Sequence, residues 1–370
     1  MRIVAIAGSQ IPSDTANSLQ VMKACNALVQ LGHDLTLIVP GAPNSSVDLK
    51  SHYGLQTDIH IEWLPALKRR LFPWGAFLRA RKLKPDLIYS WLIQSSVLAL
   101  LFKIPSVFEI HIQPTGMLGP AWHRAFAWIR GRKRIASITQ ALIDLLDHAY
   151  NIRFNADEVI IAPNGVDLER FESLPATPEL ARQKLDFPNT PTVMCTGHLY
   201  AGRGADLFLA LAKEIPQAHF VWVGGKPEDV ETWKARAESN NVTFTGFIPN
   251  QDLPLYQSAA DVLLMPYSRS IMGSSGTADS ASVASPMKMF EYMAAGRAIV
   301  TADLPVIREV LNENSAVFCE PDDLEDWKMG IGDLVNNELR KVALGKQTRE
   351  GVQGYTWLAR AEKIVQGFLV

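Results

Sequence analysis

Cysteine is scarce in this chain: Cys25, Cys195 and Cys319 are its three cysteines, and each stands alone in apolar surroundings. Their spacing suits neither a disulfide framework nor a cysteine-rich metal site. The sequence also offers no convincing Asp-x-Asp motif for a metal ion, so we expect no metal and no cofactor. Unpaired thiols persist in a reducing compartment, and the sequence therefore predicts a cytoplasmic protein.

Long apolar stretches are lacking as well. The longest, "SSVLALLFKIPSVFEIHI", is interrupted by Lys103 and Pro105, and it falls short of the roughly 20 apolar residues that a membrane-spanning helix needs. The opening "MRIVAIAGSQIP" has too short an apolar run for a signal peptide. We therefore expect neither kind of segment. A large excess of one charge is absent too, because the formal net charge is −2, and that value identifies no class of partner.

What the chain has is length and a globular composition. Its 370 residues exceed what one ordinary hydrophobic core supports, so we expect two domains. Hydrophobic residues make up 48% and charged residues 20% of the sequence, which is typical of a folded, soluble protein.

The N-terminal segment has the pattern of a βαβ unit. An apolar run, "RIVAIAG", precedes the turn-rich "SQIPSDTAN"; "SLQVMKACNALVQ" then has helical spacing, and "LGHDLTLIVPG" joins a glycine stop to a second strand. Such units form parallel sheets. Further strands are predicted at "DLIYSWL", "PSVFEIH", "RIASIT" and "EVIIAPNG", which together give a first α/β domain of residues 1–170.

A second series of the same kind follows the linker-like segment "ESLPATPELARQKLDFPNTPT". Its strands are predicted at "TVMCTG", "HFVWVGG", "VTFTGFI", "ADVLLMPY" and "AIVTA", within residues 190–354. The predicted fold class is α/β, with two Rossmann-like doubly wound domains facing a cleft and ligands at the C-terminal ends of the strands. The pattern alone does not place the final "YTWLARAEKIVQGFLV".

Lys288 is an unusual residue in "SPMKMFEYMAAGRAIV". Ser285 is a good N-cap and Pro286 suits a first helical position, so a helix is predicted to open here. A cation in its first turn opposes the helix dipole. An anion bound at residues 286 to 288 would make both the lysine and the dipole favourable. The alternative is a solvated side chain that costs a few tenths of a kcal/mol, roughly.

Glu291 lies three residues further on, among apolar neighbours. It could pair with Lys288 as a surface (i, i+3) bridge. A carboxylate in a crowded helix needs donors, however, and a sugar diol offers two hydroxyl groups for its two oxygens. Diphosphate at the helix tip and ribose one turn deeper would account for both residues.

Two further candidates follow predicted strands. Arg203 stands between two glycines in "GHLYAGRGADLF", where a guanidinium could bind phosphate oxygens; a lone loop arginine is otherwise solvated. Glu109 and His111 alternate at the end of "VFEIHIQ", where the histidine is either an acid, base or substrate ligand or a buried structural residue. Gly8 and Ser9 offer backbone N–H groups after the first strand.

A basic segment runs from Lys68 to Lys84, "KRRLFPWGAFLRARKLK", with seven basic residues, no acidic residue, and interleaved aromatic residues. It could rest on an anionic membrane surface, each basic residue contributing about 1 kcal/mol. A solvated amphipathic face is the alternative. No recognised motif accompanies it that would indicate nucleic-acid binding, so we expect no nucleic acid as partner.

Several blocks of the sequence, in this order, resemble the retaining family-4 glycosyltransferases. They are "NSLQVMKACNALVQLGHDLTLI", "PNGVD" at 163 to 167, "GHLYAGRG" at 197 to 204, "GFIPNQDLPLYQSAADVLLMPY" and "SPMKMFEYMAAGRAIVTADLPVIREV". The resemblance spans nearly the whole chain and implies the GT-B fold, in which two Rossmann-like domains enclose a cleft. It also implies that the terminal helix, residues 355–370, packs back onto the first domain.

The resemblance implies a nucleoside-diphosphate sugar as donor, with a UDP- or GDP-sugar such as UDP-glucose favoured, and a hydroxyl acceptor that is soluble or lipid-linked. Glu291 matches the second glutamate of the family's E-x7-E motif, which holds the ribose. The other positions that match functional residues of the family are Arg203, Lys288 and the adjoining Pro286 and Met287 on the diphosphate, Gly246, Phe247 and Ile248 at the base, and His111 near the transferred sugar. We expect Gly8, Ser9 and Asn17 to face the acceptor.

Val283 is a departure from the family pattern, because it occupies the position of the first motif glutamate, which contacts the donor sugar. His198 likewise stands where a second basic phosphate ligand is expected. The expected reaction is metal-independent, retaining, front-face hexosyl transfer, in which Arg203 and Lys288 stabilise the leaving diphosphate. Two alternatives stay open: a non-catalytic sugar-nucleotide-binding protein, which Val283 suggests, and a sugar-nucleotide epimerase on the same fold.

Overall fold

The computed structural model describes the chain apart from residues 45, 66–68, 114–116, 271–280 and 369–370. Lys68, the first residue of the basic segment, lies outside the described residues, as do the last two positions of the predicted C-terminal helix. The chain divides into two compact units, one of residues 1–164 together with 357–370 and one of residues 165–356.

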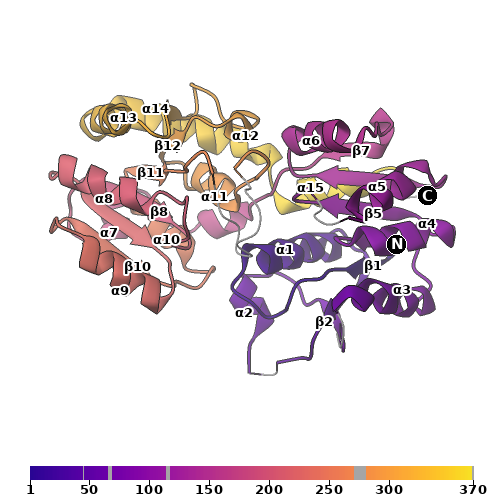
Figure 1. The fold of residues 1–370 in the computed structure, drawn as a ribbon. Coiled ribbons are helices and arrows are strands. Elements are labelled where there is room, and N and C mark those ends of the chain that lie inside the picture. Colours follow the sequence, from indigo (N-terminus) through magenta and orange to yellow (C-terminus); the bar gives the residue numbers. More distant parts are fainter. Residues whose placement is uncertain (45, 66–68, 114–116, 271–280, 369–370) are drawn as a thin grey trace. The chain divides into compact units, whose positions relative to one another are not determined.

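The first unit is built around a seven-stranded sheet in the order β3-β2-β1-β4-β5-β6-β7, with every pair of neighbours parallel (Figure 1). Its strands are β1 (Arg2–Ile6), β2 (Asp34–Pro40), β3 (His60–Leu64), β4 (Leu87–Ser90), β5 (Ser106–Ile110), β6 (Lys133–Ser137) and β7 (Val159–Ile161). Its α-helices are α1 (Ala16–Gln30), α2 (Leu49–Tyr53), α3 (Phe72–Lys82), α4 (Ile93–Leu101), α5 (Gly119–Trp128), α6 (Gln140–Tyr150) and α15 (Trp357–Val365).

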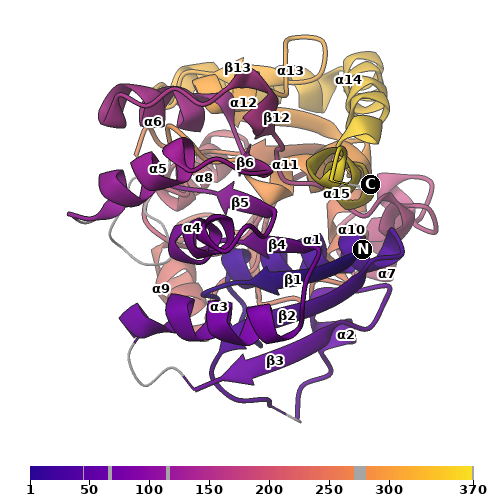
Figure 2. The same cartoon turned by 90° about the vertical axis from the view of Figure 1, so that its right-hand side faces the viewer.

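The strand order places these helices on the two faces of the sheet. The chain moves toward one edge from β1 to β3 and toward the other edge from β3 to β7. Because parallel crossovers are right-handed, α1 lies on one face and α3, α4, α5 and α6 lie on the other. Helix α15, the last in the chain, packs against α1, and α3, α4 and α5 lie side by side (Figure 2).

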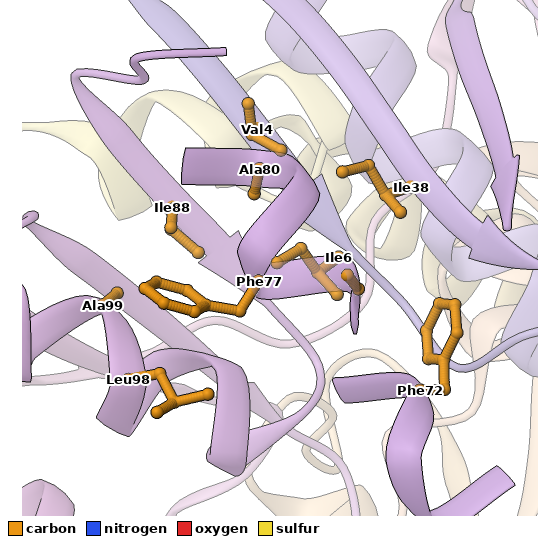
Figure 3. Close-up of a cluster of buried hydrophobic side chains, with 10 residues drawn as sticks. Val4, Ile6, Ile38, Phe72, Phe77, Ala80, Ile88, Leu98 and Ala99 are labelled. Atoms are coloured by element: carbon orange, nitrogen blue, oxygen red, sulfur yellow. The ribbon is translucent and has the colours of Figure 1, made fainter. Parts of the chain in front are cut away.

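Helix α3 contributes one apolar side to the core of this unit. Phe72 and Phe77 pack with Ile6 and Ile88 of the sheet and with Leu98 of α4 (Figure 3). Phe77 is 1% exposed. The inner side of α3 is therefore fully used by the core.

The second unit has a six-stranded, all-parallel sheet in the order β10-β9-β8-β11-β12-β13. Its strands are β8 (Thr192–Thr196), β9 (His219–Val223), β10 (Val242–Gly246), β11 (Val262–Met265), β12 (Ala298–Ala302) and β13 (Val317–Cys319). Its α-helices are α7 (Pro178–Lys184), α8 (Ala205–Glu214), α9 (Pro227–Arg236), α10 (Leu253–Ser258), α11 (Met287–Ala295), α12 (Pro305–Arg308), α13 (Leu324–Asn336) and α14 (Glu338–Gly351).

The predicted fold class is confirmed, since both sheets have the strand order and parallel pairing of doubly wound domains. Strands β3 and β13 were not predicted. Each is the edge strand of its sheet, and β3 is only half-buried while β13 spans three residues. The border after Asn164 precedes the predicted residue 170, because Phe171 is buried and Arg170 donates a hydrogen bond to the Asn250 carbonyl within the second unit.

Candidate functional site

The loop after β8 is fixed to both neighbouring strands at the point where the strand order of the second sheet reverses. The Gly197 N–H donates to the Val223 carbonyl at 2.8 Å, and Trp222 Nε1 donates to the Gly197 carbonyl at 2.9 Å. On the other side, the Ser268 N–H donates to the Gly202 carbonyl at 3.1 Å. The loop of residues 197–204 therefore has a defined position at the C-terminal ends of β8, β9 and β11.

Gly204 ends this loop and must be glycine. Its φ is +84°, and a Cβ atom there would lie 1.8 Å from the carbonyl oxygen of Pro266. Helix α8 begins directly after it. The close backbone contact fixes the backbone beside Arg203, the preceding residue, and so helps to set the direction of its side chain.

Arg203 and Lys288 come together on one aromatic side chain. Arg203 Nη1 donates to the Tyr267 hydroxyl at 3.3 Å, and the guanidinium lies 5.4 Å from the centre of that ring. The Lys288 ammonium lies 4.7 Å from the same centre. Among the residues that the structure describes, no carboxylate forms an ion pair with either cation. Two cations far apart in sequence thus share one place, and within the described ranges neither has a carboxylate partner.

The helix that carries Lys288 begins one residue later than predicted. Ser285 is not its N-cap: Pro286, with φ −67° and ψ 124°, occupies that position, and α11 starts at Met287. Pro286 makes no side-chain cap hydrogen bond, and the first turn of α11 has no acidic residue. Lys288 is therefore the second helical residue. Its ammonium donates to the Thr196 carbonyl at 3.1 Å, at the end of β8.

Glu291 does not form the surface bridge to Lys288 that the sequence allows. Gln257 Nε2 donates to its Oε2 at 3.2 Å, and Gln257 is its one hydrogen-bond partner in the described part of the chain. One carboxylate oxygen thus keeps its full capacity to accept. Tyr292, the next residue, is buried, and its hydroxyl accepts from the Thr196 N–H at 2.7 Å, which fixes α11 against β8.

The predicted base-contacting residues follow β10 at the edge of this sheet. Gly246 has φ +74°, and the strand register shifts between Phe244 and Gly246. Phe247 is 54% exposed and Ile248 is half-buried. These residues therefore lie beyond β9, on the side of β8 away from β11. Val283 is 4% exposed, so an apolar side chain occupies the position of the first motif glutamate.

The first unit has a buried ionic cluster centred on Glu109 of β5, which is 1% exposed. Its two carboxylate oxygens face Arg360 of α15 at 2.6 and 3.3 Å, and His111 Nε2 lies 2.7 Å from Oε1. Gln20 of α1 and the hydroxyl of Tyr89 also donate to this carboxylate. Four elements thus meet at one negative charge.

Burial alone would raise the pKa of the Glu109 carboxyl, but the Arg360 guanidinium and the hydrogen bond from His111 outweigh it and hold the pKa well below its usual range. The same charge, added to burial, raises the pKa of the Cys25 thiol. Arg360 also donates from Nε to the Pro163 carbonyl at 2.9 Å. His111 itself is 22% exposed, so it is held from one side and open on the other.

The remaining predicted residues lie around the same end of the first sheet. Gly8 and Ser9 follow β1, where a Cβ on Gly8 would lie 3.3 Å from a Leu92 methyl group. Ser9 is buried, and Asn17 is exposed in the first turn of α1. The structure does not bring Gly8 and His111 directly together, because β4 lies between β1 and β5.

The sequence reasoning missed Tyr267 and Gln257, which hold the cations and Glu291. Tyr267 is the last residue of the predicted strand "ADVLLMPY" and lies two positions after the end of β11, so its place at a strand end was a detectable signal. Gln257 had no such sequence signal, because its hydrogen bond to Glu291 depends on the packing of α10 against α11. Among the described residues, no group of three or more His, Cys, Asp or Glu side chains is arranged to hold a metal ion.

Comparison with known proteins gives two family matches. Residues 190–337 match the family "Glycosyl transferases group 1", and residues 19–170 match "Glycosyltransferase Family 4". A GDP-mannose-dependent monoacylated alpha-(1-6)-phosphatidylinositol monomannoside mannosyltransferase of Corynebacterium glutamicum is 27% identical over 212 residues, which are 55% of this chain and 54% of that protein. The chain thus spans about half the length of the mannosyltransferase relatives it matches.

A 2-deoxystreptamine glucosyltransferase of Streptomyces kanamyceticus is 25% identical over 303 residues, 70% of this chain and 76% of that protein. Among solved structures, Anabaena HepE in complex with UDP has a TM-score of 0.75 at 15% identity, covering 99% of both chains. WaaG, a glycosyltransferase involved in lipopolysaccharide biosynthesis, has a TM-score of 0.67 at 17% identity, covering 98% of this chain and 100% of that one. These structural matches share the fold.

Proposed function

Since this chain belongs to the family-4 glycosyltransferases, also described as glycosyl transferases group 1, we propose that it moves a hexose from a nucleoside-diphosphate sugar to a hydroxyl acceptor. The observation that carries the proposal is the pair of cations, Arg203 and Lys288, held against Tyr267 at the start of α11, with no ion-pair partner among the described residues. A diphosphate supplies negative charge to both cations and to the helix N-terminus.

In this proposal the nucleotide extends from the diphosphate at Arg203 and Lys288 along the C-terminal ends of the strands toward β10. Glu291, one turn further along α11 and with accepting capacity left, binds the ribose hydroxyls. Gly246, Phe247 and Ile248 contact the base at the β10 side of the sheet. We favour UDP or GDP as the nucleotide, because the relatives and structural neighbours include GDP-mannose-dependent enzymes and a UDP complex.

The transfer is of the retaining, front-face type and uses no metal in this proposal. The acceptor oxygen forms a bond to C1 on the side from which the diphosphate leaves, the C1–O bond to the diphosphate breaks, and a leaving phosphate oxygen takes the acceptor proton. Negative charge grows on the diphosphate, and Arg203, Lys288 and the N–H groups of α11 stabilise it. In this proposal His111, oriented by Glu109, contacts the transferred sugar, and Gly8, Ser9 and Asn17 contact the acceptor.

The acceptor is a hydroxyl compound, either soluble or lipid-linked, since the relatives include both an enzyme named for 2-deoxystreptamine and one named for a phosphatidylinositol mannoside. We place the protein in the cytoplasm, where its three buried thiols stay reduced. No helix in the described part of the chain combines the length and hydrophobicity that crossing a bilayer requires.

The test is incubation of the purified protein with UDP-, GDP- and ADP-sugars without acceptor, followed by mass spectrometry of nucleoside diphosphate and sugar. Slow hydrolysis of one donor is expected, and Arg203→Ala should abolish it. The matched control is Arg236→Ala, an exposed arginine on α9 of the same unit that pairs with Asp206. Failure of every donor to bind would overturn the proposal.

A second candidate is favoured by Val283, whose buried apolar side chain replaces a sugar-contacting carboxylate. A non-catalytic sugar-nucleotide-binding protein would bind a donor yet release no diphosphate with any acceptor. An epimerase would convert the donor sugar in the absence of acceptor and release no diphosphate. Because epimers have the same mass, chromatographic separation of the sugar nucleotides before mass spectrometry distinguishes it.

A further inference from the structure

Helix α3 has a second apolar side that the core does not use. Leu71, Trp74 and Leu78 recur at helical spacing on its outer side, and they are 61%, 43% and 57% exposed. The outward stripe continues into Arg81 and Lys82, which are both exposed. A helix on the surface of a sheet normally presents polar residues outward, so this stripe needs its own explanation.

The two helices beside α3 add to the same surface. At the end of α4, Leu101 and Phe102 are 59% and 47% exposed. Arg124 and Trp128 are exposed on α5, one turn apart, and Trp128 is 77% exposed. Met117, in the turn before α5, is 96% exposed. Three segments that are separate in the sequence therefore display large apolar side chains on the same face of the first sheet.

Contacts between aromatic rings, and between a guanidinium and a ring, join these side chains into one surface. Trp74 of α3 lies edge-on to Trp122 of α5, with ring centroids 6.0 Å apart. Phe77 lies 5.4 Å from Phe102 of α4, and the Arg81 guanidinium is 4.3 Å from the centre of the Phe102 ring. We call this surface the α3–α5 face, defined by its exposed apolar residues Leu71, Trp74, Leu78, Leu101, Phe102, Met117, Leu118 and Trp128.

The charge on the α3–α5 face has one sign. Residues 69–84, 87–105 and 117–132 contain no aspartate or glutamate. Exposed cations border the apolar residues: Arg70, Lys82, Lys84, Lys103 and Arg130. Among the described residues none of these five forms an ion pair, whereas Arg79, on the side toward β3, is neutralised by Glu62 at 2.6 Å.

We propose that the α3–α5 face rests on an anionic phospholipid surface. Tryptophan and leucine side chains enter the boundary between headgroups and acyl chains, and unpaired lysine and arginine side chains bind the lipid phosphates. The basic segment identified in the sequence supplies Leu71, Trp74 and Leu78, and the other apolar residues of the face come from the end of α4 and from α5 with the turn before it. Contact is peripheral and needs no inserted helix.

A second copy of the chain is the competing occupant. A self-associated face would bring Lys82, Lys84 and Lys103 of two copies together with no carboxylate between them, and like charges oppose such docking. An anionic lipid surface removes that opposition. Charge complementarity therefore favours the bilayer.

The experiment is cosedimentation of the whole protein with vesicles of phosphatidylcholine, with and without phosphatidylglycerol. It contains no donor or acceptor, so its outcome is separate from that of the transferase assay. We expect partitioning onto the phosphatidylglycerol vesicles at about 0.1 M salt and its loss at about 1 M, where the Debye length falls from about 10 to 3 Å.

Two pairs of substitutions localise the binding. Lys82→Gln with Lys103→Gln should weaken partitioning about 25-fold, because each basic residue contributes about fivefold. Leu78→Ser with Trp128→Ser should weaken it on both vesicle types. The matched controls lie on the second unit: Lys184→Gln with Lys346→Gln for charge, and Met329→Ser with Leu339→Ser for exposed apolar area, at 65% and 86% exposure. Both controls should bind as the unsubstituted protein does.

Three outcomes would overturn the proposal. The protein could stay in solution with anionic vesicles, or the two α3–α5 pairs could bind as well as the controls. Sedimentation equilibrium could also show a dimer that Leu78→Ser with Trp128→Ser converts to monomer without any effect of lipid, which would assign the face to a second copy.

Discussion

Lys288 and Arg203 illustrate, at the scale of single residues, how a locally unfavourable charge indicates a ligand. A lysine in the first turn of a helix opposes the helix dipole. Here the ammonium donates to the Thr196 carbonyl and faces the Tyr267 ring, so its position is fixed before any ligand arrives. A preorganised cation stabilises developing negative charge without reorganising at the moment of reaction.

Lys288→Met should therefore lower kcat about 100- to 1,000-fold, the range seen when one group that stabilises transition-state charge is removed. The change keeps the side-chain length and the helix, so the melting temperature should stay close to that of the unsubstituted protein. Steady-state kinetics of diphosphate release measure the effect. Lys346→Met, on the exposed side of α14, is the control, and equal activity of the two variants would contradict the role of Lys288.

Glu291→Gln should act on donor affinity more than on the chemical step. The amide keeps the volume of the side chain but loses the charged acceptor, and a hydrogen bond to a charged group contributes about 1.5 to 3 kcal/mol. We expect the Kd for the free nucleoside diphosphate to rise roughly 10- to 100-fold. Titration calorimetry checks this. The corresponding 2′,3′-dideoxynucleotide should bind both proteins alike, and a difference there would argue against ribose binding.

At the scale of elements, α15 is joined to the first unit by the bidentate pair of Arg360 and Glu109. Removing one partner of a buried ion pair leaves the other charge unpaired and costs about 3 to 5 kcal/mol. Glu109→Gln should lower the free energy of unfolding by that amount, as measured by denaturant titration. Glu62→Gln, which breaks the more exposed pair with Arg79, should cost clearly less.

The same pair predicts a pH dependence. The pKa of Glu109 is depressed in the folded protein, so its stabilising contribution is fully present above the pKa of an unfolded glutamate, about 4.3, and is lost as the pH falls below it. The difference in unfolding free energy between the unsubstituted protein and Glu109→Gln should stay constant from about pH 7 to pH 5 and shrink below about pH 4. A difference that grew on acidification would contradict the assignment.

Helix α3 gives a contrast within one element. Phe77→Ala removes a side chain that is 1% exposed and should cost about 3 to 5 kcal/mol of stability. Leu78→Ser, at the neighbouring but 57% exposed position, should change stability by less than about 0.5 kcal/mol. Thermal melts of the two variants test whether the outer side of α3 is dispensable for folding, as the lipid-contact proposal requires.

For the whole molecule, the sequence allowed prediction of the fold class and of the strand ends that carry the site, because parallel strands have strong local patterns. Lys288 was detectable for a similar reason: its charge conflicts with its own helix. Gln257 and the pairing of Glu109 with Arg360 depend on contacts between distant parts of the chain, 251 positions apart in the second case. No local pattern reports such a contact.

Binding of a nucleotide should change amide hydrogen exchange in the second unit only. A ligand present at about 100 times its Kd stabilises the folded state by about 2.7 kcal/mol. We expect the nucleoside diphosphate to slow amide hydrogen exchange in residues 197–204 and 287–291 of the second unit. Exchange in the loop after β1 should change only when an acceptor is added. Protection spread evenly over the whole chain would contradict the site.

The position of α15 has a consequence for synthesis of the protein on the ribosome. Residues 1–164 emerge first, but the guanidinium that neutralises Glu109 arrives only with residues 357–365, after the entire second unit has been translated. The nascent first unit therefore exposes the side of α1 that α15 later covers, and its buried carboxylate has no counterion. During that interval we expect chaperones to bind the exposed apolar surface of the first unit. Chains truncated before Trp357 should be degraded rather than accumulate.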